Sequence, residues 1–171
     1  HTVRKVSAAG VVTTLAGTAG APGAIDATGS AARFYYPSGV TVDVAGNVYV
    51  ADTSNNTLRK ITPAGAVSTF AGLAGRSSSV DGTGSAARFE DPYAVASDGG
   101  GNIFVADGTD HTIRKISPSG VVGTLAGSAG SFGSTDGAAS AARFFGPLGI
   151  AVDSAGTVYV ADTGNYTIRK I

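Results

Sequence analysis

The chain has 171 residues, a formal net charge of zero and no cysteine. Twelve basic residues balance twelve acidic ones, so no excess of positive charge marks a surface for nucleic acid or an anionic membrane. Without cysteine the chain has no disulfide, no thiol nucleophile and no thiolate metal ligand. The low charge content and the 26 glycines favour an exported bacterial repeat protein over a cytosolic enzyme.

Taken in order, the chain opens with HTVRKV, a predicted strand, and a second strand follows around residues 11–16. Residues 39–44 and 47–51 then form a predicted hairpin around an Ala-Gly turn. A third strand at residues 57–61 and a fourth at residues 66–71 complete the set. Because the apolar runs do not alternate with polar residues, both faces of these strands should be covered.

This set of strands recurs at a fixed spacing. Equivalent residues such as Asp52, Asp107 and Asp162 are 55 positions apart, which is typical of one supersecondary unit per repeat. Four antiparallel strands per unit predict an all-β fold, a β-propeller with three blades in the chain. We divide the chain into a single domain of repeat units 7–61, 62–116 and 117–171, with residues 1–6 as a duplicated third strand. We expect it to be a piece of a longer array.

A long connection of residues 18–38 precedes the first hairpin and contains the pattern D-x-x-x-S-A-A-R-F-x-x-P. Ser30 is a predicted N-cap of a single helical turn, with Phe34 directed inward. We expect the repeated arginine to tie the connection to its blade through the preceding aspartate or nearby backbone, and an anion site is the alternative. These structural residues are Asp26, Asp81 and Asp136 with Arg33, Arg88 and Arg143.

The turn after the second strand, DTSNN in the first unit, is rich in short polar side chains that bond nearby backbone. We interpret Asp52, Asp107 and Asp162 as caps of these turns. The turns lack the ligand spacing and distal glutamate of a calcium loop, so no metal is expected there.

The full pattern P-x-G-[VI]-x-V-D-x-x-G-x-[VI]-[YF]-V-A-D-T-x-N-x-x-[IL]-R-K resembles the NHL repeat. This resemblance implies a propeller, commonly of six blades, and it covers almost the whole chain. The family includes lyases, protein-binding platforms and RNA-binding domains, so the resemblance leaves the function open. The middle unit departs from the pattern at Ala94, Gly108 and Asp110. The first and third units match at Pro37, Gly39, Asp43, Gly46, Tyr49, Asp52, Asn55 and Arg59, and at Pro147, Gly149, Asp153, Gly156, Tyr159, Asp162, Asn165 and Arg169.

In a four-stranded blade, the loop after the second strand and the long connection leave the same end, so one face carries most of the loops. Binding sites concentrate on such loops. We interpret as ligand-binding the charges that the repeat does not explain and the aromatic residues of this face. The alternatives are ordinary surface variation for the charges and closure of the channel mouth for the rings. The candidates are Tyr35, Tyr36, Arg76, Glu90, Asp91, Tyr93, Asp110, His111, Phe145 and Tyr166.

These residues favour a non-enzymatic binding or scaffold module for a protein, peptide or glycan, with no cofactor and no catalytic residue. The two histidines, His1 and His111, are fewer than the three protein ligands of a catalytic zinc site. The alternatives are a lyase or hydrolase that uses His111 and the carboxylates of the middle unit, and a purely structural array.

Three units leave a propeller ring open, since rings close with about four to eight blades. We therefore expect a homodimer that completes six blades, with each strand at residues 11–16 pairing with the partner's last blade. One of the two copies of the duplicated third strand would then be displaced.

Overall fold

The regular structure of the chain is almost entirely β-strand. The computed structural model describes residues 1–171, and its helical content is limited to single turns of 3₁₀ helix, each three residues long. None of these turns has the length or the apolarity needed to cross a membrane. The predicted all-β class is confirmed.

The strands follow the predicted hairpins closely. They are β1 (Thr2–Val6), β2 (Val12–Gly17), β3 (Pro37–Val42), β4 (Val48–Asp52), β5 (Thr57–Ile61), β6 (Val67–Gly72), β7 (Gly82–Thr83), β8 (Pro92–Ser97), β9 (Ile103–Asp107), β10 (Thr112–Ile116), β11 (Val121–Gly127), β12 (Pro147–Val152), β13 (Val158–Asp162) and β14 (Thr167–Lys170). The 3₁₀ turns are η1 (Gly29–Ala31), η2 (Thr53–Asn55), η3 (Gly84–Ala86), η4 (Ala139–Ala141) and η5 (Thr163–Asn165).

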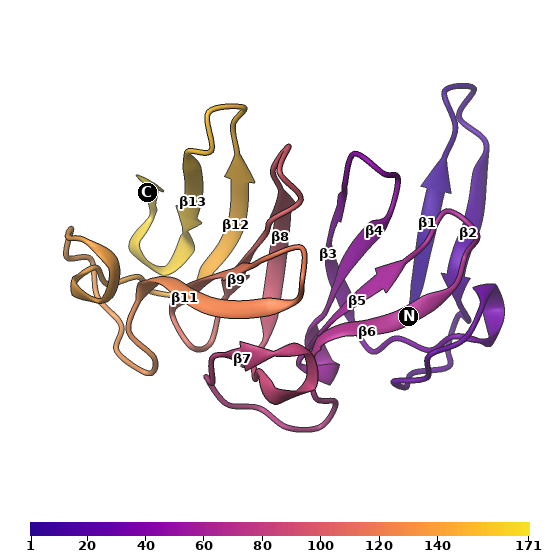
Figure 1. The fold of residues 1–171 in the computed structure, drawn as a ribbon, viewed down its shortest axis with the longest axis horizontal. Helices are drawn as coiled ribbons and strands as arrows, with labels where there is room; N and C mark the ends of the chain where they lie inside the picture. Colours follow the sequence, from indigo (N-terminus) through magenta and orange to yellow (C-terminus); the bar gives the residue numbers. More distant parts are fainter.

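The strands form four antiparallel sheets in a row (Figure 1). The first blade is β3-β4-β5-β6, and the second blade is β8-β9-β10-β11, to which the short β7 adds an outer strand. The N-terminal hairpin, β1-β2, lies at one end of the row, and the C-terminal sheet, β12-β13-β14, lies at the other. Two blades are therefore complete, and each end of the chain holds part of another.

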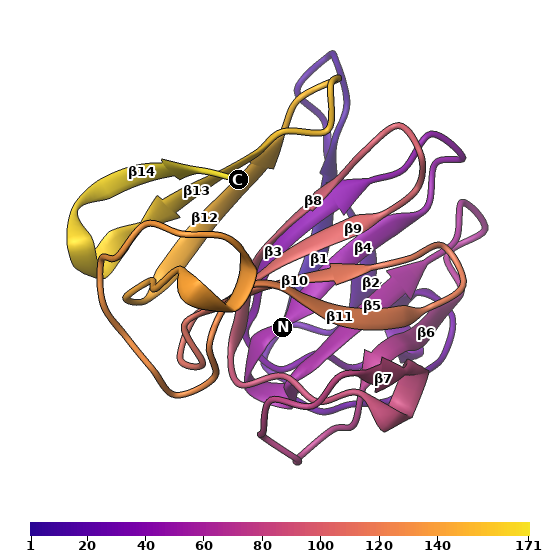
Figure 2. The ribbon, with the colours of Figure 1, turned by 60° about the vertical axis from the view of Figure 1, so that its left-hand side comes forward.

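The first strands of the blades, β3, β8 and β12, lie side by side (Figure 2). Side chains link these strands across the blades: the Thr41 and Ser97 hydroxyl oxygens are 2.9 Å apart, and the Ser97 hydroxyl donates to the Val42 carbonyl at 2.9 Å. This arrangement of radiating four-stranded sheets is that of a β-propeller.

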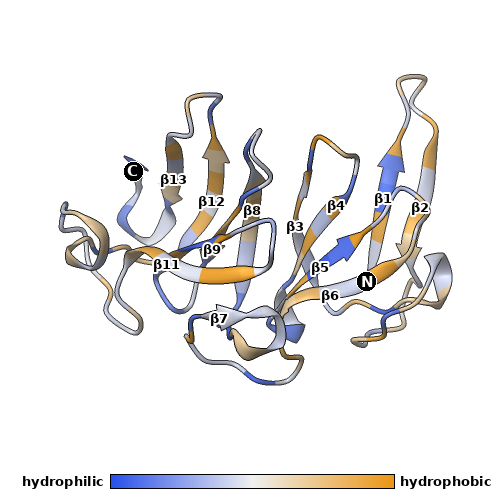
Figure 3. Ribbon diagram, in the orientation of Figure 1, coloured by the Kyte–Doolittle hydropathy of each residue, from blue (hydrophilic) through white to orange (hydrophobic).

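The hydrophobic core is divided into three clusters, one for each junction between neighbouring sheets. Phe34, Phe89 and Phe144 occupy equivalent places in the three clusters and are fully or almost fully buried. The prediction that Phe34 points inward is confirmed. Because the two complete blades are covered on both faces, apolar residues continue along their strands without strict alternation (Figure 3).

The two ends of the row leave apolar faces uncovered. Ile168 in β14 is 74% exposed, whereas its repeat equivalents Leu58 and Ile113 are fully buried. At the other end Val6 is 63% exposed, and its equivalent Ile61 is fully buried. The positions that form the core between blades are thus open to solvent at both ends.

The departure of the middle unit from the repeat pattern at Gly108 is matched by a large residue at Tyr93. Gly108 replaces the threonine found at Thr53, and a Cβ atom added at Gly108 would lie 2.6 Å from the ring of Tyr93. In the first blade the equivalent pair is small and polar, with the Ser38 and Thr53 hydroxyl oxygens 2.5 Å apart. The large ring of Tyr93 therefore occupies space that the missing side chain of Gly108 leaves free.

The long connection contains the predicted single helical turn, η1, with its equivalents η3 and η4. The prediction that Ser30 is the N-cap was wrong. Ser30 lies inside η1, and Thr28 precedes the turn without a capping side-chain bond. The Ser30 carbonyl instead accepts a hydrogen bond from Arg33, so this residue contributes through its backbone.

Candidate functional site

The loop after the second strand and the long connection meet at one end of each blade, as predicted from strand order. A backbone N–H group of the loop donates to the connection in every repeat. Ser54 donates to the Tyr35 carbonyl at 3.1 Å, Gly108 to Asp91 at 3.1 Å and Gly164 to Phe145 at 2.7 Å. These bonds fix the loop-rich face, which we define as the surface formed by these loops and connections.

A buried arginine organises each blade beneath this face. In the first blade the guanidinium of Arg59 is fully buried and bonds Asp52 at 2.9 Å and Asp26 at 2.5 Å. It also donates to the Arg33 carbonyl at 3.0 Å and lies 5.1 Å above the centre of the Phe34 ring. Arg114 and Arg169 repeat the arrangement with Asp107 and Asp81, and with Asp162 and Asp136.

The interpretation of Asp52, Asp107 and Asp162 as turn caps was wrong. The Asp52 carboxylate bonds no backbone N–H group of η2. It accepts hydrogen bonds from the Tyr35 backbone at 2.7 Å and from the Asn55 amide at 2.7 Å, in addition to Arg59. Burial raises the pKa of Asp52 and raises that of Asp107 well above the usual range, despite the neighbouring arginines.

The expected ion pair between Arg33 and Asp26 is not formed, because Asp26 bonds Arg59 instead. The Arg33 guanidinium donates to the Ser30 and Ala32 carbonyls at 2.7 and 2.8 Å, and to the Thr18 hydroxyl at 3.2 Å. Arg88 and Arg143 likewise bond the carbonyl groups of their own connections. Each of these arginines closes its connection onto itself through backbone.

Replacement of Arg88 by alanine is expected to lower the free energy of unfolding by about 1.5 to 3 kcal/mol, the usual contribution of hydrogen bonds from a charged donor. Denaturant unfolding followed by circular dichroism measures this change. Arg76→Ala is the matched control, since Arg76 is exposed in the same connection and its side chain makes no bond. Equal stabilities of the two variants would contradict a stabilising role for the bonds of Arg88.

A second repeated contact joins neighbouring blades on the loop-rich face. His1, Asn56 and His111 are equivalent residues, and each accepts a hydrogen bond from a backbone N–H group of the next blade. The donors are Tyr36 at 3.3 Å, Asp91 at 3.0 Å and Gly146 at 3.1 Å. His111 therefore serves as an acceptor between blades through its Nδ1 atom.

Two of these junctions carry aromatic clusters. The His1 ring lies 5.7 Å from Tyr35 and 6.0 Å from Tyr36. The His111 ring lies 5.6 Å from Phe145 and 5.8 Å from Phe132. The outermost rings are strongly exposed, with Tyr36 at 69% and Phe132 at 66%. Each cluster presents a partly open aromatic surface held in place by the backbone bond to its histidine.

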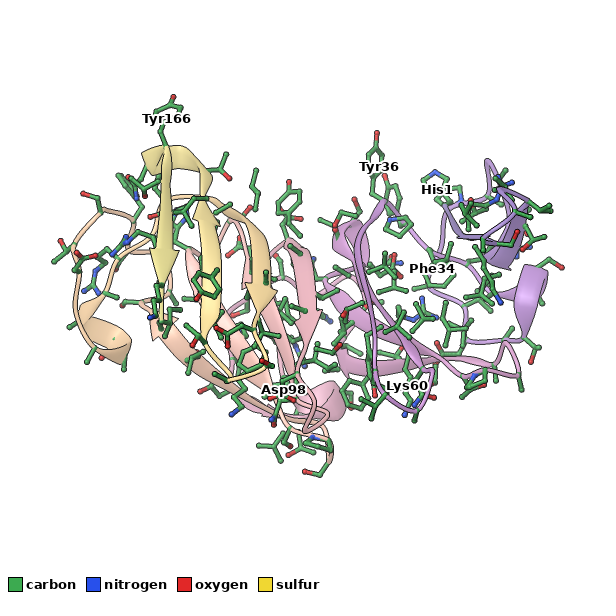
Figure 4. All side chains as sticks on the ribbon, turned by 90° about the horizontal axis from the view of Figure 1, so that it is seen from above. His1, Phe34, Tyr36, Lys60, Asp98 and Tyr166 are labelled. Atoms are coloured by element: carbon green, nitrogen blue, oxygen red, sulfur yellow. The ribbon has the colours of Figure 1, made fainter.

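The structure distributes the predicted ligand-binding residues over successive junctions rather than bringing them together. Figure 4 shows Tyr36 and Tyr166 on the side of the molecule opposite Asp98 and Lys60, with Phe34 in the interior. Glu90 and Asp91 lie at the middle junction, Tyr93 packs beside Gly108, and Arg76 is exposed in the connection before the second blade. Tyr35 and Tyr36 share one cluster, and His111 and Phe145 share another.

Asp110 is not available to a ligand. It is 3% exposed, and its carboxylate accepts a hydrogen bond from the Thr112 hydroxyl at 3.1 Å. Sequence reasoning also missed Phe132 and the buried arginines. A recurring arginine in the third strand was a signal for the latter, whereas Phe132 replaces Pro22 and Ser77 of the other units without any repeated pattern.

The sequence model of the NHL repeat matches residues 34–61 and 144–171, the first three strands of the first blade and of the C-terminal sheet. These two segments are NHL repeats. The middle repeat, with its substituted positions, has the same strand order and the same buried arginine.

Known proteins that are similar to this chain come from a plant and from a bacterium. The protein SUPPRESSOR OF QUENCHING 1, chloroplastic, of Arabidopsis thaliana is 31% identical over 149 residues, which are 81% of this chain and 14% of that protein. A solved structure of unknown function from Bacteroides thetaiotaomicron is 27% identical, with a TM-score of 0.75, and the match covers 95% of this chain and 40% of that one.

A third similar protein is an auxiliary nutrient binding protein from Bacteroides thetaiotaomicron, with a TM-score of 0.72 and 21% identity. The match covers 95% of this chain and 40% of that protein. At this identity the likeness establishes the shared fold. The chain thus spans less than half the length of each of these three proteins.

Proposed function

We propose that this NHL-repeat chain is a non-enzymatic binding module that takes a peptide, protein or glycan on its loop-rich face. The observation that carries the proposal is the pair of exposed aromatic clusters, His1 with Tyr35 and Tyr36, and His111 with Phe132 and Phe145. Exposed apolar patches on soluble proteins mark interaction sites, and aromatic rings bury a large area at low cost in side-chain entropy.

The rigidity of the two clusters supports the same role. Each central histidine accepts a backbone hydrogen bond from the next blade, so the rings are anchored to two sheets at once. Binding to such a surface requires little ordering of side chains. The similar Bacteroides protein called an auxiliary nutrient binding protein is consistent with a propeller used for binding.

The enzymatic alternative requires His111 and the carboxylates of the middle unit to act on a substrate. His111 Nδ1 accepts a hydrogen bond from the Gly146 N–H group, and the Asp91 carboxylate accepts one from the Thr109 hydroxyl at 3.0 Å. Asp110 is buried. Since these groups already serve the structure of the junctions, the binding role accounts better for their geometry. We further propose that the chain associates with a second copy of itself.

Two probes test the binding role: a random-peptide display library and an array of oligosaccharides. The intact chain is expected to enrich a ligand, and the Tyr36→Ala, Phe132→Ala double variant is expected to bind that ligand at least about tenfold more weakly, as for loss of an aromatic anchor. Val44→Ala is the control, because Val44 is an exposed apolar residue beside the β3–β4 turn, at the opposite end of the blade. Equal binding by the double variant and the control would overturn the assignment of this face.

A further inference from the structure

The outer edge of the C-terminal sheet has the features of a blade that lacks its fourth strand. In the two complete blades the fourth strand pairs with the third strand and is also bonded by the preceding connection. Gly29 donates to the Gly65 carbonyl beside β6, and Gly84 donates to Gly120 beside β11, both at 3.0 Å. The equivalent connection before the C-terminal sheet, residues 137–139, has no strand beside it.

A groove of about 880 Å³ occupies this place. Strand β14 forms one wall and the connection with η4 forms the other, and Phe144 and Leu125 contribute apolar surface. The backbone of β14 is paired only with β13, so its other edge is free to pair with a further strand.

Asp136, which lines this groove, lacks the hydrogen-bond partners of its equivalents. Asp26 accepts hydrogen bonds from the N–H group and the hydroxyl of Thr69 in β6, at 3.0 and 3.2 Å, in addition to the bond from Arg59. Asp81 accepts the corresponding two bonds from Thr124 of β11. Asp136 accepts a bond from Arg169 alone, and its side chain is 91% exposed.

We infer that this groove takes strand β2 of a second copy of the chain, with Thr14 of the second copy bonded to Asp136. The inference rests on the self-association proposed above. Thr14 stands 55 residues before Thr69 and 110 before Thr124, so it occupies the same repeat position. It is exposed, and its hydroxyl makes no bond within its own chain. The sequence of β2, VTTLAG, closely matches VSTFAG of β6.

The chain cannot supply β2 to its own groove, because the N-terminal hairpin and the C-terminal sheet lie at opposite ends of the row (Figure 1). Two copies related by a two-fold axis, the commonest symmetry of closed assemblies, can exchange β2 at two identical junctions. The exchange completes a blade at each junction, and six blades lie within the range in which propellers close.

Strands β1 and β14 are copies of the same third strand, so one of them must leave its place at each junction. Arg169 of β14 is bonded to Asp162 and Asp136, whereas Arg4 of β1 is exposed and has no ion pair. Strand β14 therefore stays and β1 is displaced. Ile168 then covers Phe34 of the second copy in place of Val3, which accounts for its 74% exposure in the single chain.

Disulfide trapping tests the strand pairing, and the absence of cysteine gives a clean background. The register of β10 with β11 pairs Lys115 with Gly123, so the inferred pairing sets Lys170 of one copy opposite Thr13 of the other. The chain carrying Thr13→Cys and Lys170→Cys is expected to form a covalent dimer of twice 16.7 kDa under mild oxidation. The Lys5→Cys, Thr13→Cys chain is the control, since these residues pair within one copy when β1 is in place.

Light scattering and sedimentation of the unmodified chain complete the test. A dimer is expected, and deletion of residues 1–6 should preserve it, whereas deletion of residues 1–17 should give a monomer. Thr14→Val is expected to raise the dimer dissociation constant about tenfold, and Thr13→Val less than about twofold, because only the first removes a donor to a charged acceptor. If the unmodified chain is a dimer but the Thr13→Cys, Lys170→Cys chain forms no covalent dimer, this strand pairing is overturned while the proposed self-association stands. A monomer at micromolar concentration would overturn both. Displacement of β1 would carry His1 away from Tyr35 and Tyr36, whereas the cluster of His111, Phe132 and Phe145 is the same with either outcome, so ligand binding by that second cluster is tested independently.

Discussion

Replacement of Arg114 by alanine is expected to lower the free energy of unfolding by about 3 to 5 kcal/mol. Arg114 is fully buried in the second blade, where it bonds Asp107 at 3.4 Å and Asp81 at 2.6 Å. Its removal leaves Asp107 fully buried without its cationic partner, and removal of one member of a buried ion pair is costly for this reason.

Arg4→Ala provides a matched control for Arg114→Ala, because Arg4 stands at the same position of the repeat but is exposed and unpaired. Both variants are compared by urea unfolding with circular dichroism. Arg4→Ala should change the stability by less than about 0.5 kcal/mol, as is usual for surface substitutions. A loss of similar size in both variants would mean that the buried network contributes little.

Phe89→Ala is the other substitution with a large expected effect, a loss of about 3 to 5 kcal/mol. Phe89 is fully buried in the core between the first and second blades, and the Arg114 guanidinium lies 5.3 Å from the centre of its ring. Truncation removes one of the buried side chains that pack the two blades against each other, and it leaves a cavity beside Gly72, whose backbone closely approaches the ring. The surrounding strands are held by ladder bonds, so they can collapse into the cavity only in part.

Phe132→Ala is the control for Phe89→Ala, since it removes the same ring from a position that is 66% exposed. Thermal unfolding of both variants separates burial from the general effect of losing a phenylalanine. If Phe89→Ala unfolded at the temperature of the unsubstituted chain, the junction between the blades would not be a source of stability.

Much of the fold could be predicted from the sequence, because the repeat displays each strand and turn several times. The alternation of short apolar runs with Gly-containing turns determined the hairpins, and the length of the connection indicated a structured segment. The partner of Asp26 could not be predicted in this way. Its true partner, Arg59, lies 33 residues away and appeared to be an ordinary charged residue of a strand, since charged side chains are rarely buried.

The candidate site was less predictable than the fold. Variation between the repeats distinguishes Tyr35, Tyr36 and Phe145, which do lie in exposed clusters. The same criterion also selected Asp110, which is buried and bonded to Thr112, and no spacing rule indicates this. A residue that differs between the repeats marks a position that is free to vary. The exposure of its side chain in the structure then distinguishes a candidate ligand surface from local packing.

The fit of Tyr93 over Gly108 has a consequence for protein engineering with these repeats. Both residues lie within residues 62–116, so a cassette of this length carries the bulky side chain together with the space that receives it. A chimera made by crossing over between positions 93 and 108 would instead combine Tyr93 with a threonine, or Ser38 with a glycine. Recombination points placed before Tyr93 or after Gly108 avoid both the steric overlap and the void, which makes the intact 55-residue unit the natural module for building longer or shorter arrays.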